Sequence, residues 1–246
     1  MKLYKGKISI LMPAYNEGEK IYENLIYAYK IFKKFRFPFE IILIDDGSID
    51  NTKNMVLKAT AEHKEIKLVS NMRNAGKGYA LKNGFEHSTG DIIVFLDSDL
   101  ENHPLQVGKL LKAMRDNNAD VVIGTRRSKK SKAKYTLQRK ILSFGYYLMI
   151  KYLFKLNLTD TQAGIKVFKR NVLEIVFPKI LCKKFAFDIE ILAIAIRKKF
   201  KVIEIPTVYI FSRENSLGRI KIKDVFDMGL DTLAIFYRMK ILHYYD

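Results

Sequence analysis

Short hydrophobic runs alternate with amphipathic stretches through the first half of the chain. Five runs are apolar, rich in β-branched residues and bounded by turn residues or acids: 8–12, 41–44, 66–69, 92–96 and 121–123. Such runs are typical of strands buried in a parallel sheet. Four stretches between them repeat apolar residues at helical spacing: 17–35, 51–62, 77–87 and 105–116. This alternation predicts an α/β fold, a mostly parallel Rossmann-like sheet with helices on both faces.

Acidic and polar residues follow three of the predicted strands. They are residues 13–17 (PAYNE), 45–48 (DDGS) and 97–99 (DSD). Since the carboxyl ends of parallel strands meet at one edge of a sheet, where α/β proteins bind ligands, we expect these residues to form a site. Asp46 or Ser48 alone is as well explained as a cap of the following helix. Five acids at one edge repel one another, however, and favour a shared ligand.

Asp97 and Asp99 are two residues apart at a predicted strand end. Carboxylates at this spacing converge on a hard cation, and Mg²⁺ or Mn²⁺ prefers such oxygens together with ligand phosphates. The four histidines have no metal-ligand spacing. Residues 76–78 (GKG) precede a predicted helix but lack the third small residue of a dinucleotide-binding loop, where Leu81 stands.

Positive charge is concentrated in one part of the chain. Lys and Arg total 44 against 26 Asp and Glu, a net charge of +18. Residues 121–159 contain ten of these bases and no acid. A block of one sign beside aromatic residues indicates a polyanionic partner, either nucleic acid or a membrane surface with lipid phosphates. The one cysteine, Cys182, excludes a disulfide scaffold and is expected in the core.

Two amphipathic stretches suit a membrane interface. Residues 141–158 are rich in apolar and aromatic side chains and follow the basic run 126–134. A helix of this composition lies in the interface plane, with its bases at the lipid headgroups; a buried core helix is the alternative. Residues 223–245 form a second such helix or one that covers the sheet. No apolar run approaches the ~18–20 residues needed to cross a bilayer, and the first residues do not resemble a signal peptide.

Motifs along the chain carry a family resemblance. P-A-Y-N-E, I-D-D-G-S, N-x-G-K-G and D-S-D-L, in this order, resemble glycosyltransferase family 2, which has the GT-A fold. Four later motifs resemble the dolichyl-phosphate sugar synthases: G-T-R (124–126), D-T-Q-A-G-I-K-V-F (160–168), F-A-F-D-I-E (185–190) and E-I-P (204–206). The resemblance is closer to the glucosyltransferase branch and extends to about residue 240.

The resemblance implies roles for individual residues. Nucleotide-binding positions match Pro13, Tyr15, Glu17, Ile44, Asp46, Ser98, Arg213 and Arg219. Metal and diphosphate positions match Asp97 and Asp99, with Glu101 as a further metal ligand where the mannosyltransferase branch has Gln. Arg126 and Arg139 match positions that place an acceptor phosphate, and together with Asp97 and Asp99 they form the expected catalytic set. Residues 102–104 (NHP) stand in place of the usual His-Pro-Pro.

The implied activity is a metal-dependent, inverting transfer of a hexose, with UDP-glucose favoured, to a polyprenyl or dolichyl monophosphate. A phosphate monoester has a second pKa of about 6, so it needs cations to place it and no general base. UDP-N-acetylglucosamine or GDP-mannose as donor stays open. So does a sugar hydroxyl acceptor, with Asp188 or Glu190 as base. A nucleic-acid partner is not expected, because three acidic strand ends would repel its phosphates.

The expected organisation has two parts. Residues 1–218 form a GT-A catalytic domain, with a nucleotide half over about 1–125 and an acceptor half over about 126–218 that includes an interface helix at about 135–158. Residues 219–246 form a C-terminal amphipathic helix. The protein is expected at the cytoplasmic face of a membrane, bound peripherally to an anionic surface without a transmembrane helix.

Overall fold

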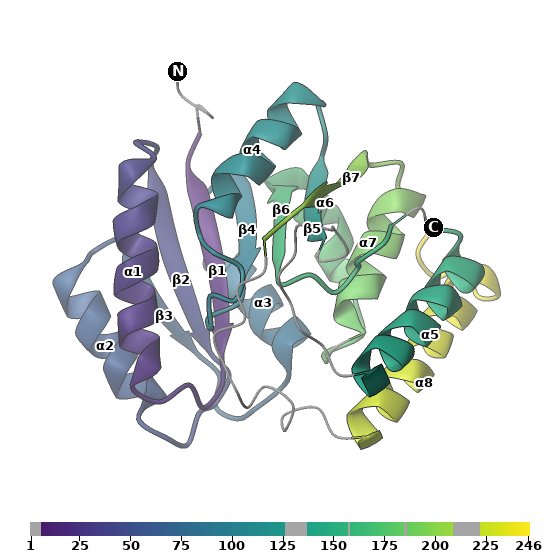
Figure 1. Ribbon diagram of the computed structural model, residues 1–246, viewed down its shortest axis with the longest axis horizontal. Coiled ribbons are helices and arrows are strands. Elements are labelled where there is room, and N and C mark those ends of the chain that lie inside the picture. The colour runs from purple at the N-terminus through teal and green to yellow at the C-terminus, as the bar shows by residue number, and fades with distance from the viewer. Residues whose placement is uncertain (1–5, 126–136, 157, 185, 209–221) are drawn as a thin grey trace.

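A seven-stranded sheet organises the molecule (Figure 1). The computed structural model describes residues 6–125, 137–156, 158–184, 186–208 and 222–246, without the side chains of 137–143 and 222–225. The strands are β1 (Ile8–Ala14), β2 (Phe39–Asp45), β3 (Ile66–Ser70), β4 (Ile92–Leu96), β5 (Val121–Thr125), β6 (Ile165–Lys169) and β7 (Val202–Pro206). Their order across the sheet is β3-β2-β1-β4-β6-β5-β7. All five strands expected from the hydrophobic runs are present.

The sheet is mostly parallel, as predicted. β1 pairs in parallel with β2 and β4, β2 with β3, and β5 with β7. β6 runs antiparallel between β4 and β5 and was not anticipated. Its sequence, IKVFK, has lysine at the second and fifth positions, which interrupts the continuous apolar run expected of a buried strand. Lys166 is nevertheless only 1% exposed, because it pairs with a buried acid described below.

Helices cover both faces of the sheet (Figure 1). They are α1 (Lys20–Lys34), α2 (Thr52–Glu62), α3 (Lys77–Glu86), α4 (Gln106–Asp116), α5 (Leu137–Phe154), α6 (Arg170–Val176), α7 (Phe187–Arg197) and α8 (Ile222–Lys240), with a short 3₁₀ helix η1 (Phe177–Lys179). One core cluster joins the sheet to α1, α2 and α4, and the other joins it to α3 and α5–α8. The two-faced cover that the alternation predicts is therefore confirmed.

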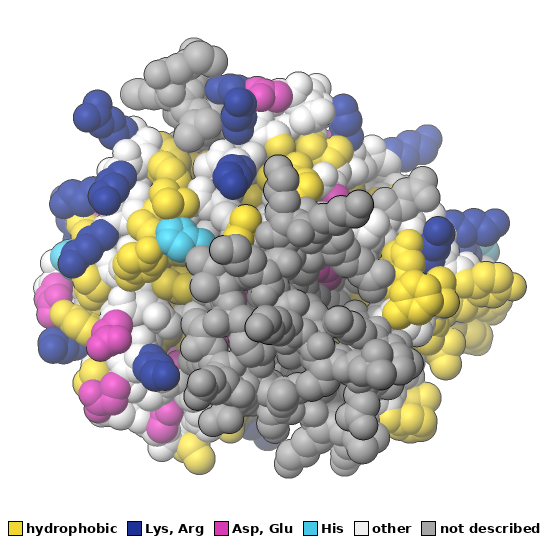
Figure 2. Space-filling model, in the orientation of Figure 1, with side chains coloured by type: hydrophobic (Ala, Val, Ile, Leu, Met, Phe, Trp, Pro, Cys, Tyr) yellow, Lys and Arg dark blue, Asp and Glu magenta, His cyan; other side chains and the backbone are white. Residues whose placement is uncertain are grey.

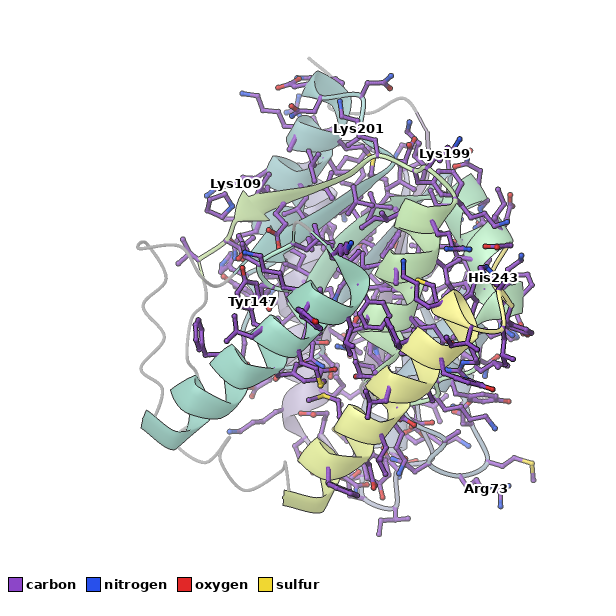
Figure 3. The ribbon with its side chains drawn as sticks, turned by 90° about the vertical axis from the view of Figure 1, so that its right-hand side faces the viewer. Arg73, Lys109, Tyr147, Lys199, Lys201 and His243 are labelled. Atoms are coloured by element: carbon purple, nitrogen blue, oxygen red, sulfur yellow. The ribbon has the colours of Figure 1, made fainter. Side chains whose placement is uncertain are left out.

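Helices α5 and α8 lie side by side at one end of the sheet (Figure 3). Tyr146 is hydrogen-bonded to Thr232, at 2.9 Å between the hydroxyl oxygens, and Phe154 contacts Phe236 one to two turns further along, so the helices run in the same direction. Phe154 and Ile150 are buried in the core cluster. Residues 141–158 thus pack one face against the core, which is the alternative that the sequence left open. They also have a second face, away from the core.

The second face of these helices is apolar and exposed. Its exposed residues are Phe144, Leu148 and Tyr152 on α5 and Phe226, Leu230, Leu233 and Tyr237 on α8. Figure 2 shows hydrophobic side chains gathered at this end of the molecule. In the part of the chain that the structure describes, no helix is long and apolar enough to cross a membrane. Tyr245, which follows α8, is buried in the same core cluster as α7, so the C-terminal segment packs on the rest of the fold. The expected boundary between a catalytic domain and a C-terminal helix at residue 218 remains a prediction.

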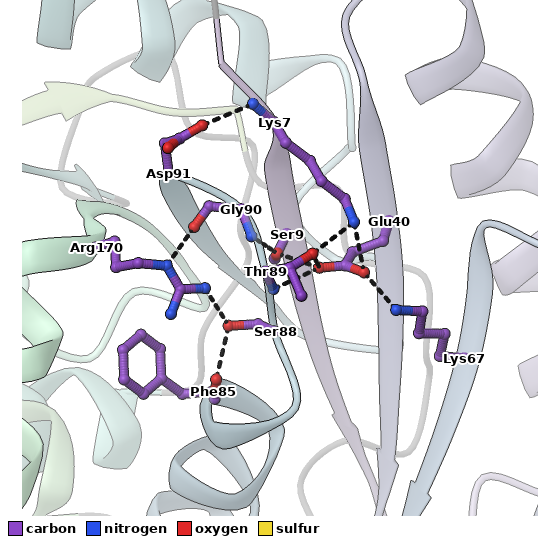
Figure 4. A network of polar contacts seen from close by, with 10 residues as sticks. All are labelled: Lys7, Ser9, Glu40, Lys67, Phe85, Ser88, Thr89, Gly90, Asp91 and Arg170. Carbon is purple, nitrogen blue, oxygen red and sulfur yellow. Dashed lines mark hydrogen bonds and ion pairs between the residues drawn. The ribbon is translucent and has the colours of Figure 1, made fainter.

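A buried carboxylate fastens the amino-terminal edge of the sheet (Figure 4). Glu40 on β2 is 1% exposed. It accepts hydrogen bonds from Lys7 and Lys67 at 2.9 and 2.8 Å, from the Ser9 hydroxyl, and from Thr89. Although burial alone would raise the pKa of Glu40, the bonds from Lys67, Ser9, Lys7 and Thr89 lower it to about 2. The carboxylate therefore joins β1, β2, β3 and the loop before β4.

Replacing Glu40 with Gln is expected to destabilise the protein by about 1–3 kcal/mol at pH 7, because charge-assisted bonds are lost. The lowered pKa stabilises the wild type fully above the unfolded value, near 4.5, and this contribution is lost as the pH falls toward 2. Urea unfolding at pH 7 and pH 3 should show a smaller difference between the proteins at pH 3. Exposed Glu86→Gln is the control, and equal losses in both variants would contradict the role of Glu40.

Candidate active site

The ends of β1 and β2 are tied together by side-chain hydrogen bonds. The backbone N–H of Asn16 donates to the Ser48 hydroxyl at 2.9 Å, and the N–H of Ile49 donates to the Asn16 carboxamide at 3.0 Å. Asn16 has a left-handed backbone, φ 52°. α2 begins after Asn51 and has no side-chain cap, so the capping role considered for Ser48 and Asp46 is wrong. Ser48 instead fixes the turn that follows β1.

Asp46 holds the loop that leads into α3. Its carboxylate is 4% exposed and accepts hydrogen bonds from the Asn71 carboxamide and from the backbone N–H groups of Ala75 and Gly76, at 2.7, 3.0 and 2.8 Å. A carboxylate has about four acceptor positions. One position is left for a ribose hydroxyl, and the expected nucleotide contact of Asp46 remains a prediction.

The GKG segment, residues 76–78, positions the side chain of Lys77. Gly76 has φ 97°, and a Cβ on Gly78 would lie 2.7 Å from Phe187 of α7, so both positions need glycine. The first N–H groups of α3, from Gly78 and Tyr79, donate to the carbonyl of Lys183. The N–H groups at the start of α3 are therefore already bonded to a backbone carbonyl, so this helix end is not a phosphate-binding loop. This agrees with the sequence, where Leu81 stands in place of the third small residue of such a loop.

Lys77 points to the acidic strand end instead. Its ammonium lies 2.6 Å from Asp97 Oδ1. Burial alone would lower the pKa of Lys77, but the carboxylates of Asp97, Asp188 and Asp99 outweigh it and raise that pKa above its ordinary value. A permanent positive charge thus lies at the end of β4.

The other side of the Asp97 carboxylate lies against Gly164. The Asp97 N–H donates to the Gly164 carbonyl at 3.1 Å, and a Cβ on Gly164 would lie 1.9 Å from Asp97 Oδ2. The loop that carries Gly164 is fixed at its start by Glu204 of the E-I-P motif, which accepts the N–H groups of Thr159 and Asp160. Its end is fixed by Lys166, whose ammonium donates to the Ala163 carbonyl.

A second, deeper ion pair supports the first. Lys166 Nζ lies 2.7 Å from Asp188 Oδ1, with side-chain exposures of 2% and 8%. Burial lowers the pKa of Lys166 below its ordinary value, although Asp188 opposes this shift. Asp188 also contributes to the raised pKa of Lys77, so the two ion pairs share one electrostatic environment. Three carboxylates, from Asp97, Asp99 and Asp188, interact with the ammonium groups of two residues, Lys77 and Lys166. The cluster therefore has an excess of one negative charge.

Two further acids, Asp99 and Glu101, follow Asp97 after β4. Asp99 accepts a hydrogen bond from the Glu101 N–H, and between them Leu100 has a left-handed backbone, φ 56°. Among the residues that the structure describes, no three His, Cys, Asp or Glu side chains are grouped to hold a metal ion. The metal ligation expected of Asp97, Asp99 and Glu101 remains a prediction.

A divalent cation nevertheless fits the residues present. Asp97 and Asp99 provide two carboxylates, and ligand phosphates complete such sites. The site already holds a cation, the Lys77 ammonium. Near Asp97 is a buried amide, Asn102, whose oxygen and nitrogen have no hydrogen-bond partner in the described parts of the chain. These donors suit Mg²⁺ or Mn²⁺.

The other predicted nucleotide residues lie around this edge. Tyr15 is 41% exposed at the end of β1, where a base or ribose has access. The side chain of Ile44 is fully buried against Gly84 of α3, so any contact from Ile44 comes from its backbone. The Ser98 carbonyl accepts a hydrogen bond from Asn24. Pro13 and Glu17 stand at the same strand end as Tyr15.

The predicted arginines cannot be placed. Arg126, Arg213 and Arg219, and the side chain of Arg139, lie outside the described residues. His103, next to the site in sequence, is hydrogen-bonded to Tyr27 of α1 at 2.7 Å. Cys182 is buried as expected, and burial raises the pKa of its thiol to about 12.

Sequence reasoning missed four residues of the site. They are Lys77, Asn102, Gly164 and Lys166. Three of these stand inside recognised motifs, N-x-G-K-G and D-T-Q-A-G-I-K, but local sequence does not show that Lys77 and Gly164 meet at Asp97. Asn102 had no signal beyond its departure from His-Pro-Pro.

Comparison with known proteins identifies relatives of the chain. The model of the family "Glycosyl transferase family 2" matches residues 9–177. The dolichyl-phosphate beta-glucosyltransferase ALG5D of Trichomonas vaginalis is 32% identical over 95% of this chain and 75% of its own length. The dolichyl-phosphate beta-glucosyltransferase of Saccharomyces cerevisiae is 31% identical over 81% of this chain and 65% of its own length.

A solved structure shares the fold. Glucosyl-3-phosphoglycerate synthase of Mycobacterium tuberculosis, in complex with Mn²⁺, UDP and glucosyl-3-phosphoglycerate, superposes with a TM-score of 0.69 at 20% identity. The match covers 94% of this chain and 79% of that protein. The expected GT-A fold is thereby confirmed.

Gly164→Ala is expected to abolish Mn²⁺-dependent binding of UDP, because its Cβ would occupy the position of the Asp97 carboxylate. Calorimetric titration of UDP with and without Mn²⁺ measures this, and thermal melting reports whether the fold is kept. Gly145→Ala is the matched control, since a Cβ there meets nothing within 4 Å. If Gly164→Ala binds UDP and Mn²⁺ as the wild type does, Asp97 is not part of the donor site.

Proposed function

The chain belongs to glycosyl transferase family 2, within the dolichyl-phosphate beta-glucosyltransferase group, and we propose that it transfers glucose from UDP-glucose to a polyprenyl or dolichyl monophosphate. The observation that carries this proposal is the arrangement around Asp97. A partly exposed carboxylate at the carboxyl end of β4 contacts a lysine and a glycine and lies near a buried ion pair and a second carboxylate. This arrangement suits a cation and a diphosphate.

On the donor side, Asp97 and Asp99 hold a divalent cation. When bound, such an ion stabilises negative charge on the departing diphosphate. Lys77 adds a second positive charge at the same place, because its raised pKa keeps the ammonium protonated. Tyr15, Asp46 and the backbone at Ile44 receive the uridine at the ends of β1 and β2.

On the acceptor side, both candidate general bases are already engaged. Asp188 is buried against Lys166. Glu190 is fully buried and accepts the N–H groups of Leu181 and Cys182 and the hydroxyl of Tyr245. A sugar hydroxyl needs a base within hydrogen-bond reach, so these contacts disfavour a hydroxyl acceptor. A phosphate monoester needs none.

The transfer is a single displacement. An oxygen of the acceptor phosphate forms a bond to the anomeric carbon while the bond from that carbon to the UDP oxygen breaks, so UDP leaves and the configuration inverts. No proton has to be removed from a dianionic acceptor. Arg126 and Arg139 are proposed to place that phosphate, since guanidinium groups bind phosphate oxygens in pairs. Asp97 and Asp99 are proposed to orient the departing UDP.

Transfer should require Asp97, Asp99 and a phosphate acceptor. Radiolabelled UDP-glucose, UDP-N-acetylglucosamine and GDP-mannose are each offered with a short polyprenyl phosphate or with a sugar acceptor, in Mn²⁺ or Mg²⁺. Product is expected from UDP-glucose and the phosphate. Asp97→Asn and Asp99→Asn should keep less than a tenth of the wild-type rate, a loss above ~1.4 kcal/mol. Transfer to the sugar acceptor alone would overturn the proposed acceptor, and another favoured donor would replace glucose.

A membrane surface is proposed as the place of reaction, since a polyprenyl phosphate resides there. The apolar face defined above on α5 and α8 provides the contact surface. Bases border it: Lys151 and Lys155 near the end of α5 and Lys240 at the end of α8 are exposed. Apolar side chains flanked by bases suit an anionic interface. The basic run 126–134 lies outside the described residues, and the cytoplasmic face is part of this proposal.

Leu230→Glu combined with Leu233→Glu is expected to release the protein from anionic vesicles. Immersing an exposed leucine contributes roughly 1.5–3 kcal/mol, so the double variant should lower partitioning at least tenfold. Sedimentation with phosphatidylcholine–phosphatidylglycerol vesicles measures it. Leu57→Glu on α2 is the control, because Leu57 is as exposed as Leu233, 47% against 49%. Unchanged sedimentation of the double variant would exclude this face as the contact surface.

A further inference from the structure

Asn102 is a buried side chain with unused hydrogen-bonding capacity. It is 1% exposed, and among the residues that the structure describes neither the oxygen nor the nitrogen of its carboxamide has a hydrogen-bond partner. Buried amides in folded proteins are nearly always satisfied, because an unmet donor or acceptor is destabilising. The contrast with Gln106 is direct: this amide, also buried, bonds both the N–H and the carbonyl of Val208. Within the described part of the chain Asn102 therefore has no partner for either polar atom, and a ligand can supply one.

The position of the amide narrows the choice of that partner. A Cβ built on Gly164 would lie 1.9 Å from Asp97 Oδ2 and 3.1 Å from Asn102 Nδ2, so the carboxylate and the carboxamide share the space above this glycine. Lys77 is bonded to the other oxygen, Asp97 Oδ1. Asn102 thus faces the side of Asp97 that Lys77 leaves open.

The charge at this point selects a cation. A phosphate oxygen beside Asp97 would be repelled, while a cation between the carboxylate and an amide oxygen is attracted by both. Carboxamide oxygens are ordinary ligands of hard divalent cations. The oxygen and nitrogen of the amide exchange places by a half-turn of its last torsion angle, so the oxygen can face the same space. A neutral oxygen also adds no charge to a site that already holds an excess negative one.

We infer that the Asn102 carboxamide oxygen is a ligand of the divalent cation beside Asp97, in the place expected for Glu101. This inference rests on the proposed function, since it takes the donor site to bind a sugar nucleotide with a metal. Asp97, Asp99 and Asn102 then provide three protein oxygens, and the diphosphate provides others. Of Glu101 and Asn102, only Asn102 contributes one of the three atoms nearest to a Cβ on Gly164.

Two substitutions separate a ligand from a structural residue. Asn102→Leu keeps the number and branching of the side-chain heavy atoms and removes an amide without a partner among the described residues, so the melting temperature without metal should be unchanged or higher. Its affinity for Mn²⁺ in the presence of UDP, from calorimetry and from the electron paramagnetic resonance of bound Mn²⁺, should fall roughly tenfold or more. Asn102→Asp keeps an oxygen and should bind Mn²⁺ at least as tightly as the wild type.

Gln106→Leu is the matched control. It removes a buried amide four residues away that is fully bonded, so it should lower the melting temperature by several degrees and leave the Mn²⁺ affinity unchanged. Asn102→Leu that binds Mn²⁺ and UDP like the wild type would overturn the inference, as would a large fall in its melting temperature. Loss of Mn²⁺ binding in Asn102→Asp would also overturn it, because the amide N–H would then be the important group. A wild type that fails to bind UDP with Mn²⁺ would instead contradict the proposed function.

Discussion

The contacts of the Asp97 carboxylate are the constraint on which the arrangement of this site depends. Its side chain is 34% exposed at the end of a buried strand, and groups from two other segments of the chain pack against it. Lys77 does so at one oxygen, and Gly164 gives the other oxygen room and a backbone carbonyl for the Asp97 N–H. Two different segments of the chain must therefore be held near β4.

Most of the other polar contacts of this region hold those two segments. Asp46 bonds the loop before Lys77, and Glu204 and Lys166 bond the loop before and after Gly164. The positions of Lys77 and Gly164 thus depend on polar residues elsewhere in the chain. Their common effect is preorganisation: the carboxylate and the ammonium are in place before a donor arrives, so little reorganisation remains to be done when charge develops.

The apolar face and the donor site are connected through α8. Gln162, two residues before Gly164, donates to the sulfur of Met228 on α8 at 3.0 Å. α8 is joined to α5 by the bond between Tyr146 and Thr232. These contacts hold the apolar face, which is proposed to contact a membrane, to the loop that carries Gly164.

Hydrophobic periodicity by itself determined the first five strands, the helices between them and the acidic edge where their ends meet, because these depend on near neighbours in the chain. The motifs determined the family. Only the tertiary structure decided that Lys166 is buried in an antiparallel strand and that Lys77 and Gly164 meet at Asp97. It also showed that Asn102 lies there without a hydrogen-bond partner among the described residues. These contacts join residues 20 to 67 positions apart, and charge compensation at such a distance leaves no periodic signal in the sequence.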